Sequence, residues 1–400
     1  MKLRFYRKVL KNGFTILFEK RELPIVSVVF AVRNGGINES AEEKGISHFI
    51  EHMLYKGTPK RNAKQIAEEI EKNGGYMNGF TDEDITAYWC KMPSKHLDVA
   101  LDVLSDMVKN PLFDPKELEK ERKVIFEEIK VRKDSPQVYV FDKIQNSMYE
   151  SPFGTPLIGT KETMNSITPE KIIDKFKKIY TPNNMILCVV GDTNMDKLVE
   201  FAEKTFGNEK GKIPQFKIKL KNEEKIEKRK GIDQANLIFA YHVPLADNKK
   251  HYAAQVLSAL MTEGMSSRLF TEIREKRNMA YAVKGDSNIN KDYAYNLIYI
   301  GTSGDCIQEV KKIILEEFQK IAKELDEKEL NQVKEQLIGN YHIAMDDSQN
   351  QMMSLLRFEI NGNTKEFYEY VKNISEVKLK DVKELAKLRD YSFFALIPEE

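Results

Sequence analysis

Cysteine and long apolar runs are scarce in this sequence of 400 residues, and each scarcity excludes a class of protein. The 3 cysteines, Cys90, Cys188 and Cys306, are widely separated and stand in strand-like contexts. They form neither a disulfide framework nor a cysteine-rich metal site, so we expect reduced thiols and a cytoplasmic protein. The longest apolar run, Met185–Val190, is far too short to cross a membrane. The first residues also lack the apolar segment of a secretory signal peptide.

An excess of charge of one sign is missing too. The chain has 63 Lys and Arg against 62 Asp and Glu, a net charge of +1. This balance gives no electrostatic reason to expect nucleic acid or a membrane surface as a partner. Hydrophobic content of 41% and charged content of 31% are ordinary for a globular protein and exclude a disordered one. The length suffices for two or more domains.

Histidine is also rare, with 6 in the chain, yet two of them enclose a short motif, His48-Phe49-Ile50-Glu51-His52. The segment is predicted to be helical, and residues three and four apart share a helical face. Two imidazoles on one face can bind one metal ion, and zinc accepts nitrogen and carboxylate oxygen ligands. A carboxylate on the same face can take a proton from water beside the metal. Single helical histidines are usually ordinary surface or core residues, but this spacing of three groups favours a metal site, and H-x-x-E-H is a known zinc motif.

A third ligand must come from elsewhere, because a zinc ion that keeps one position open for water takes three protein ligands. A helix is predicted to begin at Asp114, a capping residue, and it carries Glu121, Glu127 and Glu128. Glu121 and Glu128 are two turns apart and share a face, whereas Glu127 points about 100° away. We favour Glu128 as the ligand and Glu121 as the partner of a ligating imidazole. Solvated glutamates on a charged helix are an equal alternative at this point.

One pattern occurs twice along the chain. Ala235–Tyr241 parallels Ile25–Ala31, which lies in the strand predicted at Ile25–Val32, and a helix follows in each half. Lys8–Glu19 also alternates like a strand. We infer a duplicated α+β unit of about 200 residues, each a mostly antiparallel sheet packed against helices.

The duplication predicts the domain boundaries. Residues 1–212 form the first unit, which carries the motif, residues 213–222 a linker, and residues 223–400 the second unit. Superposing the halves on their matching strands places Leu257 and Met261 opposite the two motif histidines. The second unit is therefore predicted to lack the metal ligands.

The motif and the glutamate helix carry a resemblance to a known family. The sequence resembles the pitrilysin-type inverzincin zinc peptidases, which include mitochondrial processing peptidase and insulin-degrading enzyme. The short bacterial members are most similar, and the resemblance extends over nearly the whole chain. It implies one zinc ion per chain, bound by His48, His52 and Glu128. It also implies that Glu51 is the base and Glu121 a second glutamate needed for activity.

A second stretch, Asn78-Gly79-Phe80-Thr81, resembles the N-A-F-T edge strand of that family. In the family this strand pairs with the backbone of the substrate, so Asn78, Gly79 and Phe80 are implied substrate-binding residues. Gly79 stands where alanine is usual, which should loosen the strand slightly. Without the resemblance, the stretch would be read as an ordinary hairpin that contains glycine.

A third stretch contains Arg274 and Tyr281, which match the R-x6-Y element of the family. The resemblance implies that both side chains hold the substrate carbonyl, and both are donors suited to a developing oxyanion. On their own they would be read as a surface arginine and a half-buried tyrosine. Asn278-Met279-Ala280 departs from the usual G-L-A, so a different local turn is expected.

The resemblance implies a zinc endopeptidase that acts on peptides or unfolded segments. In longer members of the family, sites join the first and fourth units of one chain. For a chain of two units, the resemblance therefore implies a homodimer that encloses a chamber, with each site completed by the partner chain. One alternative is a non-catalytic or hetero-oligomeric structural subunit, against which the intact motif argues. The other is a metal-dependent lyase that acts on a small thioether, against which the duplication and the R-x6-Y element argue.

Overall fold

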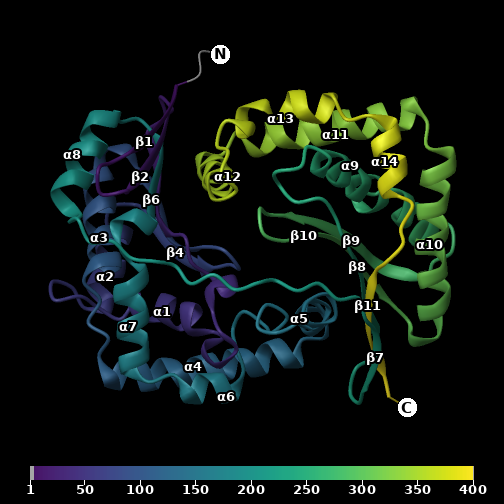
Figure 1. Cartoon of the computed structure of the whole chain (residues 1–400), viewed down its shortest axis with the longest axis horizontal. Coiled ribbons are helices and arrows are strands. Elements are labelled where there is room, and N and C mark those ends of the chain that lie inside the picture. The colour runs from purple at the N-terminus through teal and green to yellow at the C-terminus, as the bar shows by residue number, and fades with distance from the viewer. Residues whose placement is uncertain (1–3, 400) are drawn as a thin grey trace. The chain divides into compact units, whose positions relative to one another are not determined.

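The structure, a computed structural model, describes residues 4–399 as two compact units, each built on one sheet with helices packed against it (Figure 1). Unit 1 comprises Met1–Lys130, Pro156–Lys217 and Ala344–Ile360. Unit 2 comprises Val131–Thr155, Ile218–Ile343 and Asn361–Glu400. The predicted α+β fold of two similar units is confirmed. In the described residues, no helix is both long and apolar enough to cross a membrane.

The sheet of unit 1 has the strand order β1-β2-β6-β3-β5-β4. Its strands are β1 (Phe5–Val9), β2 (Thr15–Lys20), β3 (Ile25–Val32), β4 (Tyr76–Thr81), β5 (Thr86–Pro93) and β6 (Met185–Gly191). Strand β2 runs parallel to β6, and the other neighbours are antiparallel. Strand β4 lies at the edge, where a sheet can accept another strand.

The segment Lys8–Glu19, predicted as one strand, is instead a hairpin between β1 and β2. The chain turns at Gly13, whose φ of 91° lies in the left-handed region that glycine adopts readily. A Cβ at Gly13 would also lie 2.7 Å from Cβ of Asn183. The prediction was wrong because the alternation of polar and apolar residues continues through the turn.

Helices cover both faces of this sheet. The even-numbered residues of β3, from Val26 to Val32, join the main core cluster, whereas Ser27 Oγ on the other face lies 2.9 Å from Ser348 Oγ of α12. The helices of unit 1 are α1 (Ile46–Leu54), α2 (Ala63–Glu71), α3 (Leu97–Lys109), α4 (Pro115–Asp134, whose end is grouped with unit 2), α6 (Lys161–Ser166), α7 (Pro169–Ile179), α8 (Met195–Thr205) and α12 (Ser348–Ile360). Short 3-10 turns lie at η1 (Gly36–Asn38), η2 (Ala41–Glu43), η3 (Ser94–His96) and η4 (Pro182–Asn184).

The sheet of unit 2 has the order β7-β11-β8-β10-β9, the order of unit 1 without a counterpart of β1. Its strands are β7 (Glu224–Arg229), β8 (Ala235–His242), β9 (Ala280–Ile289), β10 (Ala294–Thr302) and β11 (Ser392–Pro398). Its helices are α5 (Pro136–Met148), α9 (His251–Thr262), α10 (Ile307–Glu324), α11 (Glu327–Ala344), α13 (Glu366–Ser375) and α14 (Leu379–Leu385), with a π-helical turn η5 (Phe270–Glu275) and a 3-10 turn η6 (Gly304–Cys306). The repeated strand order supports the inferred duplication.

Two helices depart from the linear division into residues 1–212 and 223–400. Helix α5 lies in the first half of the sequence but packs against β8 and β11 of unit 2. Helix α12 lies in the second half but packs against β3 and β6 of unit 1. The chain leaves unit 1 after Lys217, inside the stretch predicted as a linker. Local sequence does not reveal which sheet a helix will cover, so this exchange was not foreseen.

Candidate metal centre

Helix α1 places the two motif histidines on its face away from the core. Phe49 and Met53 are fully buried in the core cluster of unit 1, and this packing fixes the rotation of the helix. His48 and His52, on the opposite face, keep 13% and 20% of their side-chain surface exposed. The helix begins after Gly45, whose φ is 94°. The backbone N–H of Gly45 donates to Glu39 Oε2 at 2.9 Å.

Helix α4 brings the distant glutamates to the histidines. Its start is fixed as predicted, because the backbone N–H of Lys116 donates to Asp114 Oδ1 at 2.7 Å. Ile125 is buried in the core cluster, which holds one face of the helix inward. Glu121 is 6% exposed, and the side chain of Glu128 is 38% exposed.

His48, His52 and Glu128 meet around one point. Their candidate ligand atoms all lie within 4.8 Å of one another, and no other such group of His, Cys, Asp and Glu occurs in residues 4–399. Glu128 Oε2 lies 3.7 Å from Nε2 of His48 and 3.8 Å from Nε2 of His52. Ligands about 2.0–2.1 Å from a tetrahedral zinc ion lie roughly 3.4 Å apart. Two imidazole nitrogens and one carboxylate oxygen at this spacing fit a zinc ion with one open position.

Glu121 does not join these ligand atoms but holds one of the imidazoles. Its Oε2 lies 3.1 Å from His52 Nδ1, and its Oε1 lies 2.7 Å from Nζ of Lys56. A hydrogen bond from Nδ1–H to this carboxylate leaves Nε2 of His52 as the nitrogen free to ligate. Lys56 was not identified from the sequence, because only the fold shows that it shares the carboxylate of Glu121.

Glu51 lies on the motif face of α1, beside the edge strand β4. The hydroxyl of Thr81 donates to Glu51 Oε2 at 3.2 Å. Burial raises the pKa of Glu51, while the neighbouring His52 and the hydrogen bond from Thr81 act in the opposite direction. A carboxylate with a raised pKa is suited to accept a proton near neutral pH. The contact with Thr81 was not foreseen, although Thr81 lies within the stretch that resembles N-A-F-T.

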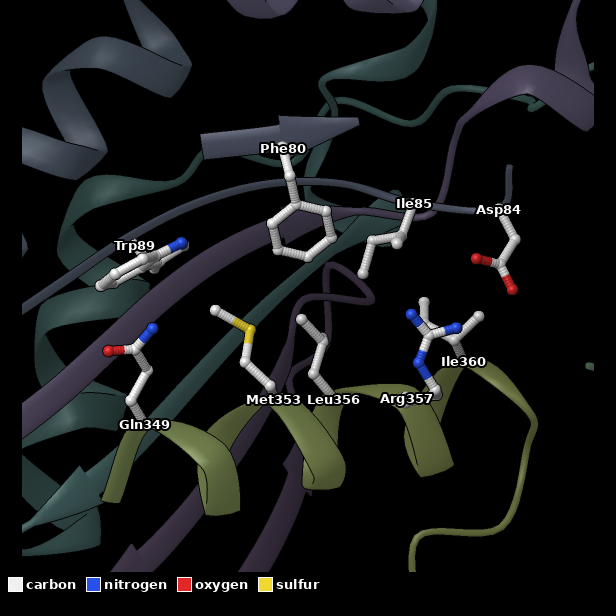
Figure 2. A pocket seen from close by; sticks show the side chains of 9 residues that line it. All are labelled: Phe80, Asp84, Ile85, Trp89, Gln349, Met353, Leu356, Arg357 and Ile360. Atoms are coloured by element: carbon white, nitrogen blue, oxygen red, sulfur yellow. The ribbon is translucent and has the colours of Figure 1, made fainter. Parts of the chain in front are cut away.

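The edge strand β4 places Gly79 and Phe80 on opposite faces. A Cβ on Gly79 would lie 3.1 Å from Glu51 Oε1, so this residue faces the motif. Asn78 Oδ1 accepts the backbone N–H of Gly79 at 2.8 Å. Phe80 faces a pocket of about 320 Å³ within unit 1. Figure 2 shows Phe80 and Trp89 on one side of this pocket and Met353 and Leu356 on α12 on the other.

Arg274 and Tyr281 lie in unit 2, close to each other. Arg274 Nη1 donates to the backbone oxygen of Tyr281 at 3.0 Å, and its guanidinium lies 5.0 Å from the ring centre of Phe270. Tyr281 is 45% exposed. Asn278, which stands where glycine is usual, has a φ of 53°. Asparagine tolerates this left-handed conformation better than most residues, and glycine adopts it readily as well.

Unit 2 has a polar pocket where unit 1 has the motif. The edge strands of the two sheets have the same register. In unit 1, Phe30 of β3 and Gly79 of β4 both pair with Tyr88 of β5. In unit 2, Phe239 of β8 and Gly285 of β9 both pair with Ile298 of β10. The pocket, of about 590 Å³, lies between this edge strand and α9. It is lined by Gln255, Ser258, Ala259, Thr262, Glu263, Gly264, Val283, Lys284, Gly285, Asp286, Ser287 and Leu337.

The residues predicted to lie opposite the motif histidines do not line this pocket. Leu257 and Met261 are fully buried in the core cluster of unit 2 instead. The superposition of the two halves without gaps was wrong, because the loop between the strand and the helix differs in length. This loop spans residues 33–45 in unit 1 and only residues 243–250 in unit 2. The helix face toward the pocket carries Gln255, Ser258 and Ala259. None of these is a usual zinc ligand.

Comparisons with known proteins agree with this architecture. The insulinase model, peptidase family M16, matches residues 15–161, and the peptidase M16 inactive domain matches residues 166–337. An uncharacterized zinc protease of Rickettsia felis is 34% identical over 86% of this chain and 85% of its own length. The uncharacterized zinc protease YmxG of Bacillus subtilis is 31% identical over 98% of each chain. A protease from Helicobacter pylori has a crystal structure with a TM-score of 0.93 at 24% identity, over 99% of this chain and 100% of that chain.

The fold and the inverted histidine motif define a short protein of the pitrilysin type, as the resemblance implied. The chain belongs to the insulinase family, peptidase family M16. Both of these relatives are named uncharacterized zinc proteases.

Proposed function

We propose that this protein is a zinc endopeptidase that hydrolyses peptides or unfolded segments. The observation that carries the proposal is the convergence of His48, His52 and Glu128, with the carboxylate of Glu51 on the same helix face. The names of the relatives support it, because relatives that match 86% and 98% of this chain are named uncharacterized zinc proteases. The cysteines Cys90, Cys188 and Cys306 are free, which supports a cytoplasmic location.

One zinc ion per chain would be held by His48, His52 and Glu128. Zinc in such a site lowers the pKa of water and polarises a carbonyl group. Glu121 orients the ring of His52 through Nδ1, so that Nε2 points toward Glu128. Lys56 in turn holds the other oxygen of Glu121.

Glu51 acts as the general base and then as the general acid. Its carboxylate takes a proton from the attacking water and passes this proton to the nitrogen of the leaving amine. The hydrogen bond from Thr81 holds one oxygen of this carboxylate, Oε2.

The substrate is bound as an added strand. A peptide in extended form would pair with the edge strand β4 at Asn78, Gly79 and Phe80. Alternate side chains of such a peptide would point to the two faces of the sheet, as in any strand. One of them would meet the pocket at Phe80, whose mostly apolar lining suits a large apolar side chain.

Arg274 and Tyr281 are proposed to stabilise the oxyanion, in keeping with the family element that they match. A homodimer with sites completed by the partner chain is proposed on the same ground. The alternatives are a non-catalytic or hetero-oligomeric structural subunit and a small-molecule lyase. Peptide cleavage by the purified chain alone would contradict both.

The substitution Glu51→Gln tests the proposal directly. The amide cannot accept the proton, but it leaves both histidines and Glu128 in place. The variant should keep the zinc content of the wild type and lose cleavage of a quenched peptide by about 100-fold or more. Cleavage at the wild-type rate would show that Glu51 is not the base.

A further inference from the structure

The hydroxyl of Tyr55 lies in a space that Gly79 leaves open beside Glu51. Tyr55 directly follows α1, one turn beyond Glu51. A Cβ built on Gly79 would lie 2.6 Å from Tyr55 Oη and 3.1 Å from Glu51 Oε1. The two oxygens therefore border the same small space, which the alanine usual at this position would fill.

The oxygen of Tyr55 is buried, and no group in residues 4–399 forms a hydrogen bond with it. Burial raises the pKa of Tyr55 above its ordinary value, so the hydroxyl keeps its proton and is available as a donor. A buried hydroxyl without a partner is unfavourable, and a water in a polar space of this kind commonly supplies one.

Among the described residues, Thr81 is the one hydrogen-bond donor to the carboxylate of Glu51. Thr81 donates to Oε2, whereas Oε1 faces the space at Gly79. A donor on the Oε1 side would hold the carboxylate from both ends and restrict its rotation. The hydroxyl of Tyr55 borders the same space as Glu51 Oε1.

We propose that Tyr55 is a positioning residue for Glu51. The hydroxyl of Tyr55 donates to a water held in the space at Gly79, and this water donates to Glu51 Oε1. Gly79 is the necessary counterpart of Tyr55, because any Cβ at residue 79 would take the position of the hydroxyl or the water. The inference rests on the proposed function, in which Glu51 is the base. It assigns a reason for the glycine on the edge strand.

In unit 2, a glycine of the edge strand also packs against a hydroxyl group at the end of a helix. Gly285 has the register of Gly79, and a Cβ there would overlap the hydroxyl of Thr262 at the end of α9. Thr262 Oγ1 donates to the backbone oxygen of Ser258 at 2.9 Å, so its own helix satisfies it. The glycine thus accompanies a hydroxyl in both units. In unit 1 the glycine also borders the carboxylate of Glu51, whereas in unit 2 the hydroxyl donates to its own helix.

Three variants test the pair: Tyr55→Phe, Gly79→Ala and the double variant. Tyr55→Phe should lower kcat about 3- to 10-fold, with KM and zinc content unchanged, because one hydrogen bond to the base is lost. Gly79→Ala should lower both kcat and the midpoint of urea unfolding, because its methyl group meets the hydroxyl at 2.6 Å. The double variant should recover the unfolding midpoint and return kcat to the level of Tyr55→Phe.

Tyr241→Phe is the matched control. It removes another buried phenol oxygen, which accepts a hydrogen bond from Asn296 Nδ2 at 3.1 Å in unit 2, and it should leave kcat unchanged. The proposal is overturned if Tyr55→Phe has the kcat of the wild type, or if the double variant is no more stable than Gly79→Ala. A wild-type chain that cleaves no peptide would overturn the proposed function and this role together. The unfolding midpoints would still report separately on the packing of the pair.

Discussion

At the scale of single residues, the three glutamates of α4, Glu121, Glu127 and Glu128, differ in what surrounds their side chains. Glu128 faces both motif imidazoles, and Glu121 shares its oxygens between His52 and Lys56. Glu127 points to solvent with a side chain that is 74% exposed, near Lys130. The helical period predicted only that Glu121 and Glu128 share a face and that Glu127 does not. The separate roles of Glu128 and Glu121 were implied by the resemblance.

Glu121→Gln should weaken zinc binding by about 10- to 100-fold, because the amide no longer accepts the hydrogen bond of His52 Nδ1 as strongly. Competition with a chromophoric chelator measures this change. Glu127→Gln, on the same helix and adjacent to the ligand, is the control and should bind zinc like the wild type. Equal affinities for all three proteins would show that Glu121 does not support the site.

His251, at the start of α9, should make stability depend on pH. It is 5% exposed, and burial lowers its pKa from 6.5 to about 4, an effect that Asp247 partly opposes. The unfolded chain then binds more protons than the folded one between these two values, so stability falls as the pH drops from about 6.5 to 4. The loss attributable to this residue is on the order of 3 kcal/mol.

Urea unfolding at several pH values tests this prediction. His251→Phe should reduce the loss of stability between pH 6.5 and 4, because no proton then binds preferentially to the unfolded chain at this position. Substitution of the exposed His342 by Gln is the control and should leave the pH profile unchanged. An identical profile for His251→Phe and the wild type would contradict the assignment.

At the scale of the element, the start of α1 depends on a buried carboxylate. Glu39 accepts the backbone N–H groups of Gly45 and Ser47 at 2.9 and 2.7 Å. Lys44 Nζ lies 3.9 Å from its Oε2, and both side chains are fully buried. Glu39 thus satisfies the first donors of the helix that carries the motif.

Glu39→Ala should destabilise the protein by about 3–5 kcal/mol, because it leaves the ammonium of Lys44 buried without this partner. Asn194→Ala, which removes the side-chain cap of α8, should cost only about 1 kcal/mol. Glu39→Ala should also weaken zinc binding, whereas Asn194→Ala should not. If both variants lose the same stability and bind zinc equally, Glu39 is an ordinary cap.

The sequence predicted elements well where the signal is local. The strand Ile25–Val32 and the start of α4 are found as predicted, because alternation and capping residues act over a few positions. The hairpin turn at Gly13 and the exchange of α5 and α12 between sheets were missed. Both depend on tertiary packing, which no local pattern reports.

Sequence prediction of the candidate site has the same limit, because contacts made by tertiary packing are not visible in local patterns. Three ligands and the base were predicted from spacing and resemblance, and the structure brings these four side chains together in unit 1. Thr81, Lys56 and Tyr55 were not identified from the sequence. The fold brings Thr81 to Glu51, Lys56 to Glu121, and the hydroxyl of Tyr55 to the space beside Glu51.

At the scale of the whole molecule, the zinc residues and the R-x6-Y element belong to different units of one chain. If each site takes Arg274 and Tyr281 from a partner chain, two inactive variants should complement each other. A mixture of Arg274→Ala and Glu51→Gln chains forms mixed dimers in which one of two sites is intact. Random exchange should therefore restore about a quarter of the wild-type activity. No recovery after verified exchange of subunits would contradict sites shared between chains.

The central claim is that His48, His52 and Glu128 hold one zinc ion. X-ray absorption at the zinc edge of the zinc-loaded protein tests it most directly. The account predicts a shell of nitrogen and oxygen ligands at about 2.0–2.1 Å, with the scattering pattern of two imidazoles, and loss of this signal in His48→Ala. A spectrum without imidazole scattering, or one that His48→Ala leaves unchanged, would contradict it.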